Sequence, residues 1–110
     1  MKVIQKENYI IIEGNNDDLG GLATLISQEH KEIQKDNVVI DILAKEDLKE
    51  KDLLVFLEIS NLHRLQKKSF VIAAREMSFD NIPEELIVVP SLREAEDIIN
   101  MEELERELEH

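Results

Sequence analysis

The chain has 110 residues, and its 25 acidic and 13 basic side chains leave a formal charge of -12 at pH 7. This length suits a single domain, and the negative field repels phosphate backbones and anionic lipids, so we expect neither nucleic acid nor a membrane as a partner. The absence of cysteine excludes disulfides and thiolate metal sites. No apolar run approaches the ~20 residues of a membrane span and no signal peptide opens the chain, so we expect a cytoplasmic protein.

The first predicted elements form a β-hairpin followed by a helix. Short β patterns at Val3 and Ile4 and at residues 9–12 are separated by so few polar residues that only an antiparallel hairpin can connect them. The turn at residues 14–18 supplies a helix N-cap. Apolar residues at helical spacing then predict one amphipathic helix from Asp17 to about residue 35.

The middle of the sequence predicts a β-α-β unit. The runs at residues 38–42 and 70–74 are almost wholly apolar and β-branched, which is typical of parallel strands covered on both faces by helices. The roughly 27 residues between them allow a crossover helix, which we expect to follow a capping box made by Asp47 and Glu50. Its apolar arc is wider than one sheet face requires, so we expect part of it to face a partner.

The remaining elements are a short helical segment, a strand and a long helix. Residues 77–82 predict one or two helical turns that end at Pro83, and residues 87–89 predict the last strand. A capping box of Ser91 and Glu94 begins the final helix. The expected fold is therefore α/β, in the order β-β-α-β-α-β-α-β-α, with a mixed sheet of about five strands in one domain over residues 1–107.

The C-terminal stretch is the most acidic part of the chain. Eight acidic residues lie between Glu94 and Glu109. This concentration fits a solvated helix face or a docking surface for a basic partner. The last three residues, Leu108, Glu109 and His110, look like the remnant of an expression tag, so they are left out of the functional interpretation.

The element order and one short motif resemble a known family. The strand at residues 38–42, the gap before Lys49 and the closing Val-Pro-Ser-Leu-Arg-Glu-Ala from Val89 to Ala95 are similar to the STAS domain, the fold of anti-sigma factor antagonists and of sulfate-transporter tails. The resemblance extends from the first hairpin to Met101. It implies a STAS-like fold and a non-catalytic, regulatory domain that binds another protein.

The resemblance also locates the family's phosphorylation switch. Regulatory members carry Asp-Ser-Ser-Gly at the start of the helix after the third strand, and a partner kinase phosphorylates a serine there. The matching residues here are Lys49, Glu50, Lys51 and Asp52, with Lys51 at the phosphoacceptor position. Because lysine cannot replace serine in that chemistry, we expect no serine phosphoswitch and one permanent binding state.

We expect an unidentified protein to bind at the start of this helix and at the adjoining loop of residues 77–82, and the chain itself to be a monomer or weak dimer. The predicted contact residues are Asp47, Lys49, Glu50, Lys51, Asp52, Met77 and Phe79. The same surface offers an alternative function, a sensor of a nucleotide or other small anion, because a helix start and two lysines attract negative charge.

No catalytic or cofactor pattern is present, so we expect no enzymatic activity, no metal and no cofactor. Gly14, Gly20 and Gly21 lack the spacing of a phosphate-binding loop. Small chains that look like this one carry the name ribonuclease Z, but that hydrolase needs a His-x-His-x-Asp-His zinc cluster. Here His30 and His63 each stand alone in the sequence, so we disfavour that activity.

Three residues with possible site chemistry have simpler structural interpretations. His30 borders the apolar face of the first helix and is expected to be partly buried, and His63 is expected on a helix surface beside Arg64. Asp41 is the charged residue of an apolar strand, near the end where ligands of α/β sheets gather. It is either a site residue or, more commonly, a carboxylate that binds loop amides.

Overall fold

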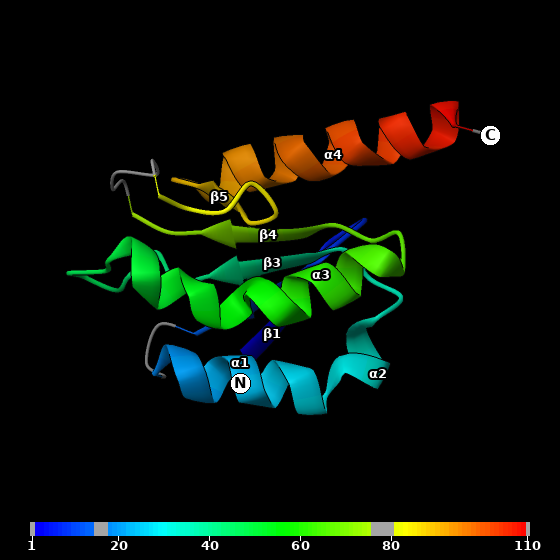
Figure 1. The fold of residues 1–110 in the computed structure, drawn as a ribbon. Coiled ribbons are helices and arrows are strands. Elements are labelled where there is room, and N and C mark those ends of the chain that lie inside the picture. The colour runs from blue at the N-terminus through cyan, green and yellow to red at the C-terminus, as the bar shows by residue number, and fades with distance from the viewer. Residues whose placement is uncertain (1, 15–17, 76–80, 110) are drawn as a thin grey trace.

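The computed structural model describes residues 2–14, 18–75 and 81–109. Within these residues, five strands form one sheet in the spatial order β1-β2-β3-β4-β5 (Figure 1). The strands are β1 at Lys2–Gln5, β2 at Ile10–Glu13, β3 at Val38–Asp41, β4 at Phe70–Ala73 and β5 at Ile87–Val89. β1 is antiparallel to β2, and the remaining neighbours are parallel, so the predicted mixed α/β sheet is confirmed.

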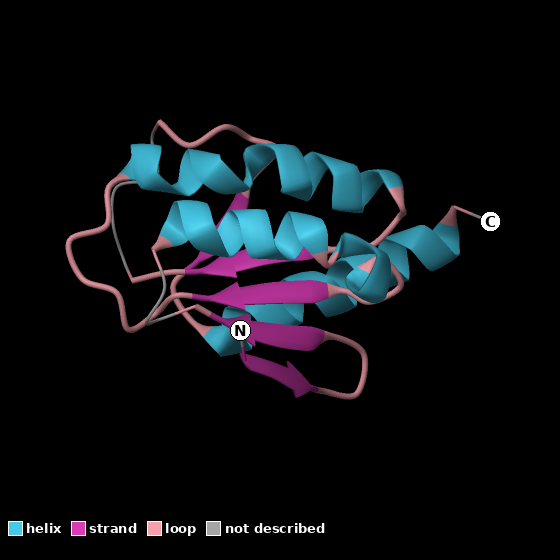
Figure 2. Cartoon of the chain, turned by 90° about the horizontal axis from the view of Figure 1, so that it is seen from below, coloured by secondary structure: helices cyan, strands magenta, loops and turns pink. Residues whose placement is uncertain are grey.

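Helices cover both faces of this sheet. The described helices are α1 at Leu19–Gln28, α2 at His30–Ile33, the 3-10 helix η1 at Glu50–Phe56, α3 at Leu57–Leu65 and α4 at Leu92–Leu108. α1 and the continuous η1–α3 helix lie side by side on one face, and α4 crosses the other (Figures 1 and 2). None of the helices in the described ranges combines the length and apolar character needed to cross a membrane.

Alternate residues of the central strands enter two separate cores. Ile40 and Ile72 point to the face covered by α1 and η1–α3, whereas Val39 and Val71 point to the face covered by α4. Because successive side chains of a strand point to opposite faces, a sheet covered on both sides needs apolar residues at every position. This requirement explains the unbroken apolar runs of the sequence.

The first predicted helix is wrong in its extent, because it is two helices. The amide of Glu29 bonds back to the carbonyl of Leu25 at 3.0 Å and ends α1. The chain then turns into α2, which buries both His30 and Ile33. The predicted N-cap is confirmed at Asp18, whose carboxylate accepts the Gly21 amide at 2.9 Å.

The crossover helix begins later than its predicted capping box. Asp47 has a φ of 58°, in the left-handed region, whereas an N-cap residue needs extended backbone. Lys49 has that extended conformation, and its amide donates to the carboxylate of Asp52 at 2.9 Å. The Asp47–Glu50 box was therefore wrong, and the helix begins with the 3-10 turns of η1 at Glu50.

The C-terminal elements follow the prediction closely. Ser91 caps α4, since its hydroxyl accepts the Glu94 amide at 3.1 Å and donates to the Glu94 carboxylate at 2.8 Å. Leu104, near the C-terminal end of α4, is 56% exposed. The predicted helical turns at residues 77–82 lie mostly outside the described residues.

Candidate functional site

The parallel strands end together at one edge of the sheet, called here the C-terminal edge. Glu13, Asp41, Ala73 and Val89 are the last residues of β2, β3, β4 and β5. The loop after β3 and the start of η1 leave from this edge. Ligands and partners of open α/β sheets gather at such edges, and the described contact candidates from Asp47 to Asp52 lie beside this one.

Asp41 has a structural role at this edge. Its side chain is buried, and Oδ1 accepts the amide of Leu43 at 3.0 Å. This bond shapes the first turn of the loop after β3. The interpretation of Asp41 as a carboxylate that binds a loop amide is therefore confirmed.

The start of η1 binds two backbone amides with its own carboxylates. Asp52 accepts the amide of Lys49, and Glu50 Oε2 accepts the amide of Asn81 at 2.9 Å. The second bond joins two segments that are far apart in the sequence. It brings η1 next to residue 81 at the end of the predicted contact loop.

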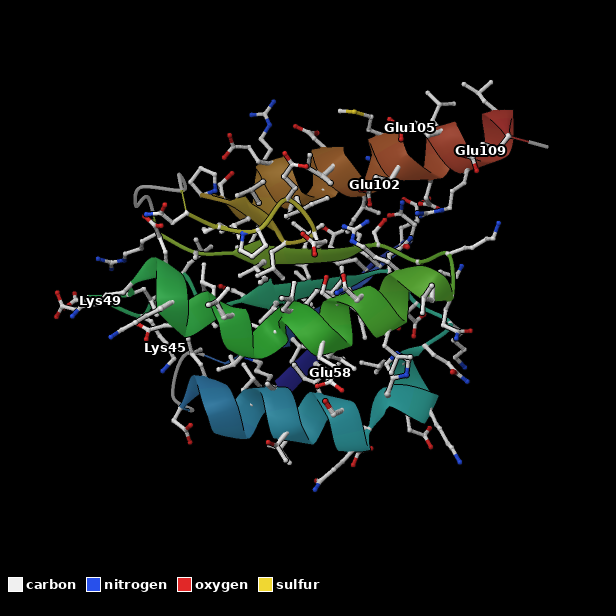
Figure 3. The ribbon with its side chains drawn as sticks, in the orientation of Figure 1. Lys45, Lys49, Glu58, Glu102, Glu105 and Glu109 are labelled. Carbon is white, nitrogen blue, oxygen red and sulfur yellow. The ribbon has the colours of Figure 1, made fainter. Side chains whose placement is uncertain are left out.

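The predicted contact residues differ in their accessibility. Asp47, Lys49 and Lys51 are exposed, and Glu50 and Asp52 are half-buried because of the amide bonds that they make. Lys49 extends into solvent at one tip of the molecule, and the half-buried Lys45 lies close behind it (Figure 3). Met77 and Phe79 lie outside the described residues.

Arg75 belongs to the same surface, although sequence reasoning missed it. Its Nε donates to the carbonyl of Leu43 at 2.9 Å, and a guanidinium nitrogen lies 3.7 Å from a carboxylate oxygen of Glu46. Both charged side chains are more than half exposed, so their ion pair adds little stability. The bond to Leu43 holds the loop after β3 against the end of β4. The sequence signal that could have identified Arg75 is its position directly after the apolar run that forms β4.

The charges of this surface balance one another. Among the described residues 43–52 and 74–75, four cations and four acids lie on the loop after β3, at the start of η1 and after β4: Lys45, Lys49, Lys51, Arg75, Glu46, Asp47, Glu50 and Asp52. These eight described side chains together carry no net charge, in a chain whose net charge is -12.

The opposite edge, where the parallel strands begin, is called the N-terminal edge and contains a buried histidine pair. His63 is completely buried, so its predicted place on a helix surface was wrong. Its Nε2 lies 2.7 Å from the carbonyl of Asp36, and its Nδ1 lies 3.2 Å from Nε2 of His30. A carbonyl only accepts, so His63 Nε2 carries a proton and the neutral His63 Nδ1 accepts from His30.

Burial lowers the pKa of His63 below its usual value of 6.5. The bond to the Asp36 carbonyl acts in the opposite direction, and the neighbouring His30 and Arg64 lower the pKa further. His63 is thus held neutral as a structural link between α3 and α2. Among the described residues, no group of three histidine or carboxylate side chains is arranged to hold a metal ion.

A second buried network at the N-terminal edge is centred on Asn37, which sequence reasoning also missed. Its Oδ1 accepts the amide of Ser69 at 2.8 Å and a guanidinium N–H of Arg106 at 3.2 Å. Its Nδ2 donates to the carbonyl of Asn8 at 3.0 Å. The network joins the beginnings of three strands to the end of α4.

Arg64 adds a further bond between α3 and α4. It donates to the carboxylate of Glu102 at 3.2 Å and to the carbonyl of Phe70 at 3.0 Å. The inward side of α4 therefore changes from apolar residues, such as Ile99, to polar ones where the helix reaches the N-terminal edge. Glu102, one of the acidic residues predicted for a solvated face or a docking surface, therefore forms an ion pair within the fold.

Neither a scan against protein-family models nor a search of curated proteins finds a match to this chain. Its STAS-like character therefore stays a prediction from the sequence.

Proposed function

We propose that the chain is a non-catalytic STAS-like domain that binds another protein through the C-terminal edge of its sheet and stays in one binding state. The two carboxylates at the start of η1 support this proposal. The carboxylate of Asp52 accepts a hydrogen bond from the amide of Lys49, and that of Glu50 accepts one from the amide of Asn81. Permanent negative charge thus holds the backbone of this edge in place.

The absence of a switch follows from the chemistry of this position. A phosphoserine at a helix start acts by adding nearly two negative charges where amides point outward. Lys51 stands at the matching position, and its exposed amine offers no hydroxyl for phosphorylation. Glu50 and Asp52 already supply charge to the neighbouring amides, so the proposed surface does not depend on a kinase.

A sensor of small anions is the second candidate for the same surface. Lys49 and Lys51 are exposed beside a helix start, which favours this alternative. The carboxylates of Glu50 and Asp52 weigh against it, because an incoming anion would meet their charge and find two amides already bonded. Protein binding is therefore the better supported function.

The positions of the histidines support a non-catalytic role. His30 and His63 are buried at the N-terminal edge, far along the strands from the proposed contact surface. Their described bonds are to each other and to a backbone carbonyl. Neither is available to activate a nucleophile at the C-terminal edge.

A pull-down with charge-reversed variants tests the proposal. The double variant Lys49→Glu, Lys51→Glu alters two exposed side chains of the surface, and Lys31→Glu, Lys35→Glu makes the same charge change on exposed residues elsewhere. We expect the first variant to lose at least about 1.4 kcal/mol, a tenfold reduction, in binding to a protein captured from the native host's lysate. The second variant should retain it.

Two results would contradict this function. Equal capture by both double variants would move the contact away from the C-terminal edge. Chemical-shift changes confined to residues 47–52 on addition of a nucleotide or inorganic phosphate, with no captured protein, would favour the anion sensor.

Intact-mass analysis of chain from the native host should show no stoichiometric phosphate on serine.

A further inference from the structure

A groove runs between α1 and the η1–α3 helix, on the outer side of the helical layer. It has a volume of about 490 Å³. Its walls are Gly20, Ala23, Thr24, Ser27 and Gln28 on α1, and Val55, Glu58 and Ile59 on the opposite helix. Small side chains form one wall and larger side chains form the other, so the groove lies open along the two helices.

The rim of the groove carries exposed apolar side chains. Val55, which lines the groove, and Leu62 are each more than 40% exposed. Leu62 follows Glu58 by one helical turn, on the same side of α3. Large apolar side chains gathered on one face of a monomer indicate an interaction surface, which agrees with the wide apolar arc predicted for this helix.

Two hydroxyl groups of the α1 wall are bonded within their own helix. The hydroxyl of Thr24 donates to the carbonyl of Gly20 at 3.0 Å, and that of Ser27 donates to the carbonyl of Ala23 at 2.9 Å. Both hydroxyls are thereby satisfied within α1. Their carbon atoms remain to contact whatever enters the groove.

Charge is nearly absent from this face. Of the described residues 19–28 and 53–62, Glu58 alone is charged, although charged residues make up 35% of the chain. Figure 3 shows Glu58 between α3 and α1. Among the described residues, none forms a hydrogen bond or ion pair with the carboxylate of Glu58. Charge depletion around an apolar centre is typical of the core of a protein interface.

We propose that this groove binds a basic amphipathic helix of another protein. Apolar side chains of that helix would cover Val55 and Leu62, and one lysine or arginine would pair with Glu58. Helix-in-groove recognition uses apolar anchors one helical turn apart in this way. The contact surface is separate from the C-terminal edge and does not depend on the function proposed there.

Charge complementarity selects this occupant over a second copy of the chain. A net charge of -12 repels another copy at long range and attracts a basic partner. In a two-fold contact through this groove, Glu58 of each copy would also lie against the same region of the other, and like charges would meet in an apolar setting. A cation from a different protein instead satisfies Glu58.

Titration of the isotope-labelled full chain with a model peptide tests the proposal. The probe is a helical peptide of about 15 residues built from leucine and lysine, and its control carries glutamate in place of lysine. We expect the basic peptide to shift amides of α1, η1 and α3, and the acidic peptide to shift none. Shifts that gather instead on the acidic face of α4 would overturn the proposal.

Paired variants separate groove binding from general attraction to an acidic protein. Leu62→Ser should raise the Kd of the basic peptide about fivefold, whereas Leu104→Ser, a similarly exposed leucine on α4, should change it less than about twofold. Glu58→Gln should raise the Kd roughly twofold to fivefold, and the matched Glu105→Gln on α4 should change it less. Equal effects within both pairs would contradict a groove site.

Sedimentation equilibrium of the chain alone tests the competing occupant. We expect a monomer for the wild type and for Leu62→Ser. A wild-type dimer that Leu62→Ser dissociates would assign the groove to a second copy and overturn the proposal. Tighter association of Glu58→Gln with itself would support the same conclusion.

Discussion

Polar side chains at the N-terminal edge of the sheet are mostly buried and bond between helices and strands, whereas those at the C-terminal edge lie at the surface and bond mainly to backbone groups of the loops. Asn37, His63 and Arg64 connect strands with α2, α3 and α4. Asp52 and Glu50 instead satisfy amides at the surface. The first arrangement stabilises the fold and the second shapes a surface, so a change at each edge should have a different consequence.

A substitution in the core between the two edges should cause the largest loss of folding stability. Phe56 is completely buried and lies 6.5 Å from Phe70 between ring centroids. Phe56→Ala should reduce the free energy of unfolding by roughly 3 to 5 kcal/mol, because it leaves a cavity in the main core. Urea melts measure the loss, and Leu54→Ala on the exposed side of the same helix is the control. A loss below about 1 kcal/mol would contradict the burial of Phe56.

Asn37→Ala tests the N-terminal edge directly. The substitution leaves the buried Ser69 amide without an acceptor, removes one of the two acceptors of the Arg106 guanidinium and removes the donor to the Asn8 carbonyl. We expect the free energy of unfolding to fall by about 2 to 4 kcal/mol. The control Asn61→Ala, at an exposed position of α3, should stay within about 0.5 kcal/mol of wild type. Similar small losses in both variants would remove the distinction between the edges.

The histidine pair predicts a pH dependence at the same edge. Burial lowers the pKa of folded His63 below 6.5, so the unfolded chain binds more protons as the pH falls through 6.5. The contribution of His63 to the free energy of unfolding is therefore fully present above pH 6.5. It falls as the pH decreases from 6.5 toward the pKa of His63 in the folded chain, by at most about 1.4 kcal/mol per pH unit. Urea melts between pH 7.5 and about 5.5 measure this slope, before most carboxylates titrate.

His63→Gln is the matching variant, because it removes the titrating group from the edge. Its stability at neutral pH should be lower, since the bonds to Asp36 and His30 are altered. Its unfolding free energy should vary less between pH 7.5 and about 5.5 than that of the wild type. An unchanged slope would show that other groups cause the pH dependence.

Asp52→Ala should have the smallest structural effect of the series. It removes the acceptor of the Lys49 amide at the start of η1, and loss of such a cap costs about 1 kcal/mol. Lys51→Ala, one residue earlier and exposed, should cost less than about 0.5 kcal/mol. Amide hydrogen exchange at Lys49 should rise in the first variant alone. A loss near that of Asn37→Ala would place Asp52 among the groups that hold the fold.

The sequence by itself determined the sheet and most of its covering helices. The apolar runs that became β3 and β4 need no alternation when both faces are covered, and Ser91 caps α4 with groups only three residues away. These signals are local, since each depends on neighbouring residues and on the period of one element. The prediction that a partner binds at the start of the crossover helix rests on the same kind of signal.

Only the tertiary structure decided which polar residues are buried together. His63 stands beside Arg64 in the sequence and has no local mark of burial, yet α2 turns at Glu29 and brings His30 against it. Asn37 meets Arg106 across 69 residues, and Glu50 meets the Asn81 amide across 31. The apolar groove beside Glu58 likewise exists only because α1 and α3 pack side by side. Such contacts depend on the relative placement of whole elements, and no spacing within one element encodes them.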